Sequence, residues 1–149
     1  MLQLKSLIVG GLVPAILLGA GSVLMKLSLR AGSSVPNYLA QVGAAVLLIG
    51  LCASALNGGW VSTYKASTFA LTMGVAWASA IGLMAYAVSV LQVPVSILSP
   101  LTNTNALVAV TFSAIIFKEW QSLDMTKVLT GTMLIAAGAY VVATAQIKS

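Results

Sequence analysis

Apolar segments long enough to cross a lipid bilayer follow one another along almost the whole of this 149-residue chain. One helical crossing needs about 20 apolar residues, so the length allows roughly four to six crossings with short connections. Only 6% of the residues are charged and the mean hydropathy is +1.06, whereas soluble domains carry about 25% charged residues. The sequence therefore predicts an all-α integral membrane protein.

Turn sequences divide the chain into five expected transmembrane helices within a single domain over residues 1–149. Residues 32–36 and 57–59 are rich in Gly, Ser, Asn and Pro, which favour turns. Only residues 92–93 separate the third helix from the fourth, which predicts a tight helical hairpin. Ser122 or Asp124 can cap the fifth helix by accepting hydrogen bonds from its free N–H groups. The expected helices cover about 7–29, 38–56, 68–91, 94–117 and 125–146.

The fourth segment is more polar than a lipid-facing helix should be, because lipid offers no hydrogen-bond partners. Pro100 lacks an N–H group and therefore frees the carbonyl of Ser96, which predicts a kinked helix with exposed carbonyls. By helical angle Asn103 shares a face with Ser96, whereas Asn105 points nearly opposite. These groups either bond to neighbouring helices or line a cavity that binds a polar solute. The run comprises Ser99, Pro100, Thr102, Asn103, Thr104 and Asn105.

Small residues recur along one face of the first helix, between Gly11 and Lys26, and of the third, between Gly74 and Gln92. Such faces let membrane helices approach closely, so they are either packing seams alone or seams whose polar ends border a solvated cavity. Lys26 lies about one turn from the end of its helix and can extend to the headgroups. Pointing inward instead, it would attract anionic solutes.

The fifth helix carries two adjacent columns of small residues at a spacing of seven. Such columns form a flat ridge suited to a long helix–helix contact. We expect this ridge to join two subunits, with a contact inside one subunit as the alternative. The columns are Thr130, Ala137 and Thr144, and Gly131, Gly138 and Ala145.

Several kinds of chemistry are excluded by what the sequence lacks. It has no histidine and one cysteine, Cys52, which excludes zinc, haem and iron–sulfur sites and a disulfide, so we expect no metal or cofactor. The two acids, Glu119 and Asp124, follow the fourth helix, so no expected span carries a carboxylate for a proton relay. No nucleophile set or phosphate loop is present, and we expect no enzyme. The lysines and arginine stand near helix ends, where they meet lipid headgroups and do not indicate nucleic acid.

Several stretches resemble the drug/metabolite transporter superfamily, in an order and spacing that cover essentially the whole chain. The last of them is similar to the terminal helix of EamA-type permeases and of small multidrug resistance proteins. The essential membrane-embedded Glu of the latter aligns with Leu18 here, which argues against proton-coupled export of cationic drugs. The loop at 120–124 is slightly longer than in EamA units. The stretches are Gly19-Ala-Gly-Ser-Val-Leu-Met-Lys26, the hairpin from Tyr86 to Pro94, Phe-Lys-Glu-Trp at 117–120 and Gly131-Thr-Met-Leu-Ile-Ala-Ala-Gly138.

The resemblance implies a single five-helix EamA-like unit, of the size found in the bacterial/archaeal transporter family. We expect it to transport a small polar solute, neutral to anionic, by alternating access across the plasma (inner) membrane. Its partners would be lipids and a second copy or close paralogue. The alternatives are a non-catalytic membrane subunit that stabilises a larger complex, and a component that flips lipid-linked substrates. Solute contacts are expected from Ser99, Thr102, Asn103, Lys26 and Tyr86.

The positive charges are almost balanced between the two sides of the membrane. A difference of one charge favours a cytoplasmic N-terminus only slightly, and a dual-topology protein that pairs antiparallel would show the same balance. In the superfamily, ten-helix members contain two units in opposite orientation, as inverted repeats do. Five spans place Lys5, Lys65, Lys118 and Lys127 on one side, and Lys26, Arg30 and Lys148 on the other.

Overall fold

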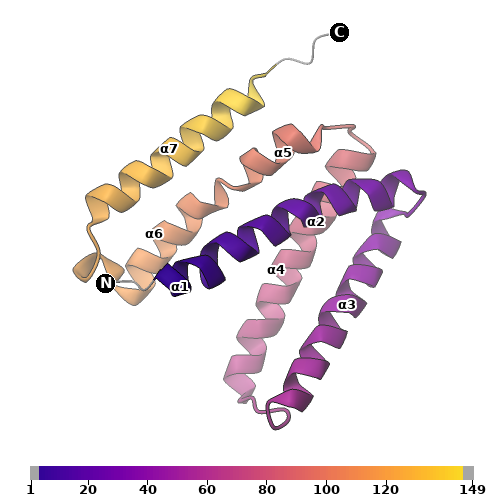
Figure 1. Ribbon diagram of the computed structural model, residues 1–149, viewed down its shortest axis with the longest axis horizontal. Helices are drawn as coiled ribbons and strands as arrows, with labels where there is room; N and C mark the ends of the chain where they lie inside the picture. The colour runs from indigo at the N-terminus through magenta and orange to yellow at the C-terminus, as the bar shows by residue number, and fades with distance from the viewer. Residues whose placement is uncertain (1–3, 146–149) are drawn as a thin grey trace. The chain divides into compact units, whose positions relative to one another are not determined.

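The structure, a computed structural model, describes residues 4–145 and consists of helices joined by short turns (Figure 1). Five of its segments are long and apolar enough to cross a membrane, which confirms the predicted all-helical class and number of spans. The predicted end of the fifth span, Gln146, and the charge of Lys148 lie outside the described residues. The five segments are Leu4–Arg30, Val35–Leu56, Tyr64–Ser89, Val95–Phe117 and Met125–Ala143.

The first span contains a widened turn where its sequence places a proline. It is built from α1 (Leu4–Leu7), a π-helical turn η1 (Ile8–Leu12) and α2 (Val13–Arg30). The Val13 N–H donates to the carbonyl of Ile8, five residues back. Pro14 follows directly, and its ring would crowd the preceding turn of a regular helix. The wider turn gives the ring room.

The second and third spans begin earlier than the sequence predicted, because hydroxyl side chains cap them. Ser34 accepts a bond from the Asn37 N–H at 3.4 Å and starts α3 (Val35–Leu56). Thr63 accepts a bond from the Ala66 N–H at 3.3 Å and starts α4 (Tyr64–Ser89). Both caps satisfy N–H groups that a helix start leaves free. The residues at 64–65, which precede the predicted start of the third helix at 68, therefore form part of the first turn of α4.

The helices form two compact units, Met1–Gln92 and Val93–Ser149, and each is described by itself. The single domain and the hairpin between the third and fourth spans stay predictions. In the first unit α2, α3 and α4 pack against one another, with α3 and α4 side by side (Figure 1). Their buried residues are Met25, Ala85 and Val88. The predicted small-residue seams are thus used only toward the end of α2 and of α4, since Gly11 and Gly74 are exposed.

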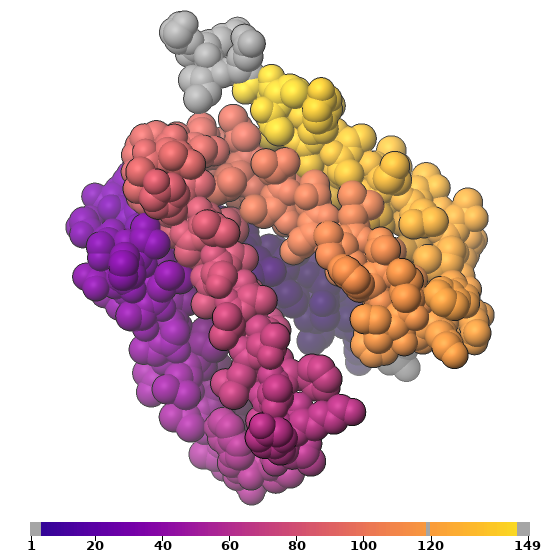
Figure 2. Space-filling model, turned by 180° about the vertical axis from the view of Figure 1, so that it is seen from behind, coloured from indigo at the N-terminus to yellow at the C-terminus, as the bar shows by residue number. Residues whose placement is uncertain are grey.

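The second unit contains α5 (Val95–Thr102), α6 (Asn105–Phe117), a 3₁₀ turn η2 (Glu119–Gln121) and α7 (Met125–Ala143). Helix α7 packs along both α5 and α6, as the space-filling view also shows (Figure 2). Lys118 ends α6 in the left-handed conformation, with φ of 55°, and so turns the chain toward α7. The predicted cap is Asp124, which accepts a bond from the Lys127 N–H at 3.3 Å.

Few side chains are buried in the described chain. The second unit adds Ala114, Thr132 and Ala139 to the buried residues of the first. All but two of the buried described residues are alanine or threonine, the exceptions being Val88 and Met25, so mostly small side chains make the helix contacts. In a bilayer, exposed apolar side chains face lipid at no cost, and close packing of small residues holds helices together.

Candidate functional site

The fourth span is broken within its polar run. Helix α5 ends at Thr102, Asn103 and Thr104 form a turn, and α6 begins at Asn105, so Figure 1 draws two separate coils. The sequence predicted a kink in one continuous helix at Pro100. The structure places the interruption at residues 103–104, one turn after the proline. We call residues 96–107 the α5–α6 break.

Tightened hydrogen bonds replace the regular helical ladder in the α5–α6 break. The Thr104 N–H donates to the Leu101 carbonyl at 3.2 Å and the Ala106 N–H to the Asn103 carbonyl at 3.2 Å. The Leu107 N–H likewise donates to the Thr104 carbonyl at 3.0 Å. Each bond spans three residues, as in a 3₁₀-helix, where an α-helix would span four.

This change of spacing removes the usual donor from three carbonyl groups. Ser96 would bond to the N–H that Pro100 does not have. Pro100 and Thr102 would bond to the N–H groups of Thr104 and Ala106, which donate elsewhere. Carbonyl groups in the hydrocarbon region need other partners, so irregular backbone is tolerated there only where protein or a polar cavity surrounds it.

Three of the predicted solute contacts belong to the α5–α6 break. Within the described chain the Ser99 hydroxyl oxygen is buried without a hydrogen-bond partner. The Thr102 hydroxyl donates to the Ser99 carbonyl at 2.9 Å, so its proton is already used. Asn103 ends α5 and its side chain is exposed. The structure brings these residues together because they occupy consecutive turns of one segment.

The other two predicted contacts lie in the first unit. Lys26 is partly buried near the end of α2, and Tyr86 on α4 is 47% exposed. The hydroxyls at the polar ends of the two seams donate to their own helices, Ser22 to the Leu18 carbonyl at 3.1 Å and Ser89 to the Ala85 carbonyl at 2.8 Å. These bonds satisfy both hydroxyls within their own helices.

A pocket of about 240 Å³ lies in the second unit. Its lining is apolar apart from Ser113, and none of the predicted solute contacts lines it. It therefore suits an acyl chain better than a polar solute, and we do not assign it to solute recognition. It lies between α6 and the start of α7, lined by Ala109, Val110, Ser113, Ala114, Leu123, Met125 and Val128.

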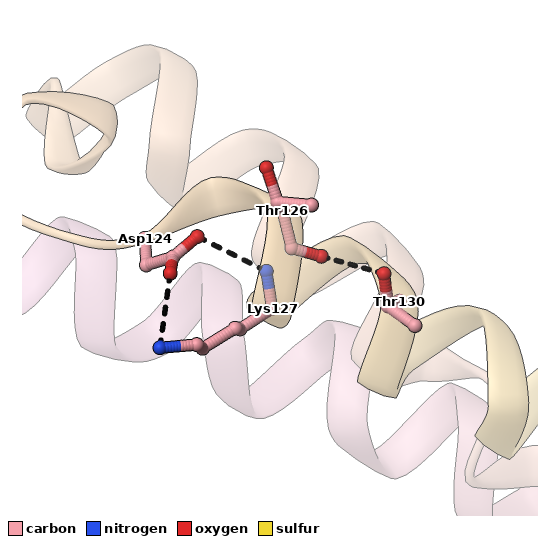
Figure 3. Close-up of polar contacts among 4 residues, drawn as sticks. All are labelled: Asp124, Thr126, Lys127 and Thr130. Atoms are coloured by element: carbon pink, nitrogen blue, oxygen red, sulfur yellow. Dashed lines mark hydrogen bonds and ion pairs between the residues drawn. The ribbon is translucent and has the colours of Figure 1, made fainter.

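The fifth span begins with a charged cap at the end of this pocket. Asp124 binds Lys127 twice, through the Lys127 N–H and through an ion pair of 3.2 Å between Nζ and Oδ2 (Figure 3). One turn later the Thr130 hydroxyl donates to the Thr126 carbonyl at 2.7 Å. The acid thus stabilises the positive end of α7, and its charge is balanced by the lysine.

The residues predicted to form a subunit interface are exposed on α7 and just after it. They are Thr130, Gly131, Ala137, Gly138, Thr144 and Ala145. The contacts of α7 within its own unit involve a third column instead, Thr132 and Ala139, which are both buried. Sequence reasoning missed this column, although it shows the same spacing of seven and also consists of small residues. The subunit interface stays a prediction.

Sequence reasoning also missed the part that Thr104 plays in the break. Its hydroxyl donates to the Leu101 carbonyl at 2.7 Å, next to the bond from its own N–H. A threonine in a polar run after a proline was the available signal, since its hydroxyl competes with the backbone ladder.

No protein-family model, curated protein or solved structure matches the chain. The resemblance to the drug/metabolite transporters therefore stays a prediction, and the function is argued from the chemistry of the α5–α6 break.

Proposed function

We propose that this protein is a transporter, or a transporter subunit, for a small polar solute, neutral to anionic. It works by alternating access, as a dimer of single EamA-like units in the plasma (inner) membrane. The observation that carries the proposal is the α5–α6 break, where three carbonyl groups have lost their usual donors inside a membrane-spanning segment. Helices broken within a membrane span are typical of transporter binding sites, where they line the pathway of the solute.

The break offers a solute both backbone and side-chain groups. The buried hydroxyl of Ser99 and the exposed Asn103 belong to the same short segment as the freed carbonyls of Ser96 and Pro100. Binding a solute there would replace hydrogen bonds that the chain does not make for itself. Lys26 and Tyr86 remain candidates for a second part of the solute pathway.

A thermal-shift screen of small solutes on the purified protein tests the site. A solute that binds at the break should raise the unfolding temperature of the wild type and of Asn105→Ala, and raise that of Asn103→Ala much less. Asn105 is the matched control because it is also an exposed asparagine, but it begins α6, beyond the turn at residues 103–104. Solutes that stabilise all three proteins equally would contradict the proposed site.

A second candidate function is that of a membrane subunit that stabilises a larger complex. The exposed small-residue columns of α7, at Thr130 and Gly131 and their equivalents one and two heptads later, favour contact with a partner helix of some kind. Purification in mild detergent separates the two functions. A stoichiometric second protein supports the subunit, and a homodimer that takes up solute in proteoliposomes supports the transporter.

A further inference from the structure

The backbone N–H groups from 103 to 107 are, with one exception, used within the α5–α6 break itself. Four N–H groups and two hydroxyls donate to only four carbonyls, so two of these carbonyls accept twice. The Leu101 carbonyl, for example, accepts from both the N–H and the hydroxyl of Thr104. Among the backbone N–H groups from 103 to 107, only that of Asn105 stands outside these bonds.

The acceptors, by contrast, are in excess. The carbonyls of Ser96, Pro100 and Thr102 have each lost the donor that an α-helix would supply. The amide of Asn103 adds donors and acceptors in equal measure, and the hydroxyls of Ser96 and Ser99 can each donate and accept. The balance of the site is therefore toward acceptors, and its best ligand is one that donates.

Charge decides which donor fits. A carboxylate only accepts hydrogen bonds, and the freed carbonyl oxygens would repel it. A cationic group such as an ammonium would donate hydrogen bonds well. The five spans contain no Asp or Glu, however, so no negative charge would offset the free-energy cost of removing the cation from water. Hydroxyl groups donate without carrying charge and avoid both costs.

We infer that the solute of the α5–α6 break is a neutral polyhydroxylated molecule that donates hydrogen bonds to the carbonyls of Ser96, Pro100 and Thr102. This inference rests on the proposed function and narrows its solute from neutral or anionic to neutral. The anionic part of the earlier expectation came from Lys26, which belongs to the first unit.

Uptake into proteoliposomes of the full chain tests the inference with three solutes of five carbons each: xylitol, glutarate and choline. Xylitol should enter faster than into protein-free liposomes, and glutarate and choline should not. Uptake of glutarate or choline without xylitol would overturn the polyol assignment and leave transport intact. No uptake of any of the three would overturn the proposed transport function as well.

A proline variant tests the carbonyls directly. Pro100→Ala supplies an N–H for the Ser96 carbonyl and should lower xylitol uptake by about tenfold, the equivalent of one lost hydrogen bond. Pro36→Ala is the control, because Pro36 stands in the first turn of α3, where no carbonyl depends on its N–H. Equal xylitol uptake by the two folded variants would overturn the inference. Should Pro100→Ala fail to fold, the selectivity of the wild type among the three solutes decides.

Discussion

The N–H of Thr104 donates to the carbonyl of Leu101, at 3.2 Å, and not to that of Pro100, which would be its partner in an α-helix. This change of partner shortens the spacing of the hydrogen bond from four residues to three, and the break between α5 and α6 begins there. It also leaves the Pro100 carbonyl available at a position inside a membrane-spanning segment.

Pro100→Ala should stabilise the protein by about 1 to 3 kcal/mol, because proline inside a helix removes a hydrogen bond and crowds the preceding turn. Thermal unfolding in detergent, followed by circular dichroism, measures the change. Pro36→Ala should leave the unfolding temperature almost unchanged. A Pro100→Ala protein no more stable than Pro36→Ala would show that the break does not depend on the proline.

Ser99→Ala should also stabilise the protein, by about 1 to 2 kcal/mol, because it removes a buried hydroxyl that has no partner in the described chain. Ser89→Ala is the matched control, since its partly buried hydroxyl donates to the Ala85 carbonyl at 2.8 Å. The control should be neutral or slightly destabilising. The reverse order of unfolding temperatures would mean that the Ser99 hydroxyl is satisfied in the membrane.

Gly82→Ala should be less stable than Gly74→Ala by about 1 kcal/mol or more, although both lie on α4. A Cβ at Gly82 would stand 3.1 Å from Leu39 Cδ1, whereas nothing lies within 4 Å of a Cβ at Gly74. Crowding of this kind opposes the gain of about 1 kcal/mol that alanine brings to a helix. Equal stabilities in denaturation would contradict the close approach of α3 and α4.

Asp124→Ala should destabilise the protein by about 1 kcal/mol through loss of the helix cap, and the loss should persist at high salt. Lys127→Ala removes only the exposed ion pair, whose side chains are 85% and 53% exposed for Lys127 and Asp124, and should cost less. Unfolding at low and high ionic strength separates the two effects. A loss in Asp124→Ala that vanishes in salt would point to the ion pair instead of the cap.

Gly138→Leu should convert a dimer into a monomer, because a leucine on the exposed face of α7 would keep a partner helix at a distance. No atom lies within 4 Å of a Cβ at Gly138, so the variant should fold. Gly50→Leu on α3 is the control, being equally open. Light scattering in detergent measures the mass of the protein in solution. A dimer that persists in Gly138→Leu would exclude this face of α7 as the subunit interface.

Fusions of reporter proteins at the C-terminus test the expected orientation. An antiparallel dimer requires both orientations of the same chain, which the near balance of positive charges allows. Signals from both sides of the membrane are expected. A single clear orientation would exclude the antiparallel arrangement and leave a parallel pair.

The apolar composition and the turn residues by themselves determined that this chain is helical and has five membrane-length segments. This was possible because bilayer thickness and backbone hydrogen bonding leave a long apolar segment few alternatives. The capping residues Ser34 and Thr63 can also be recognised in the sequence. The prediction relied on the apolar pattern alone, however, and so placed the starts of the second and third spans too late.

The tertiary structure decided the form of the fourth span and the packing face of α7. A proline predicts a disturbed helix, but the choice of Leu101 as partner of Thr104 depends on hydrogen bonds among several residues at once. Likewise, three columns of small residues on α7 are equivalent in sequence, and only packing against α5 and α6 selected Thr132 and Ala139 for burial. Periodicity shows which residues share a face of a helix, whereas the neighbouring helices decide which face is covered.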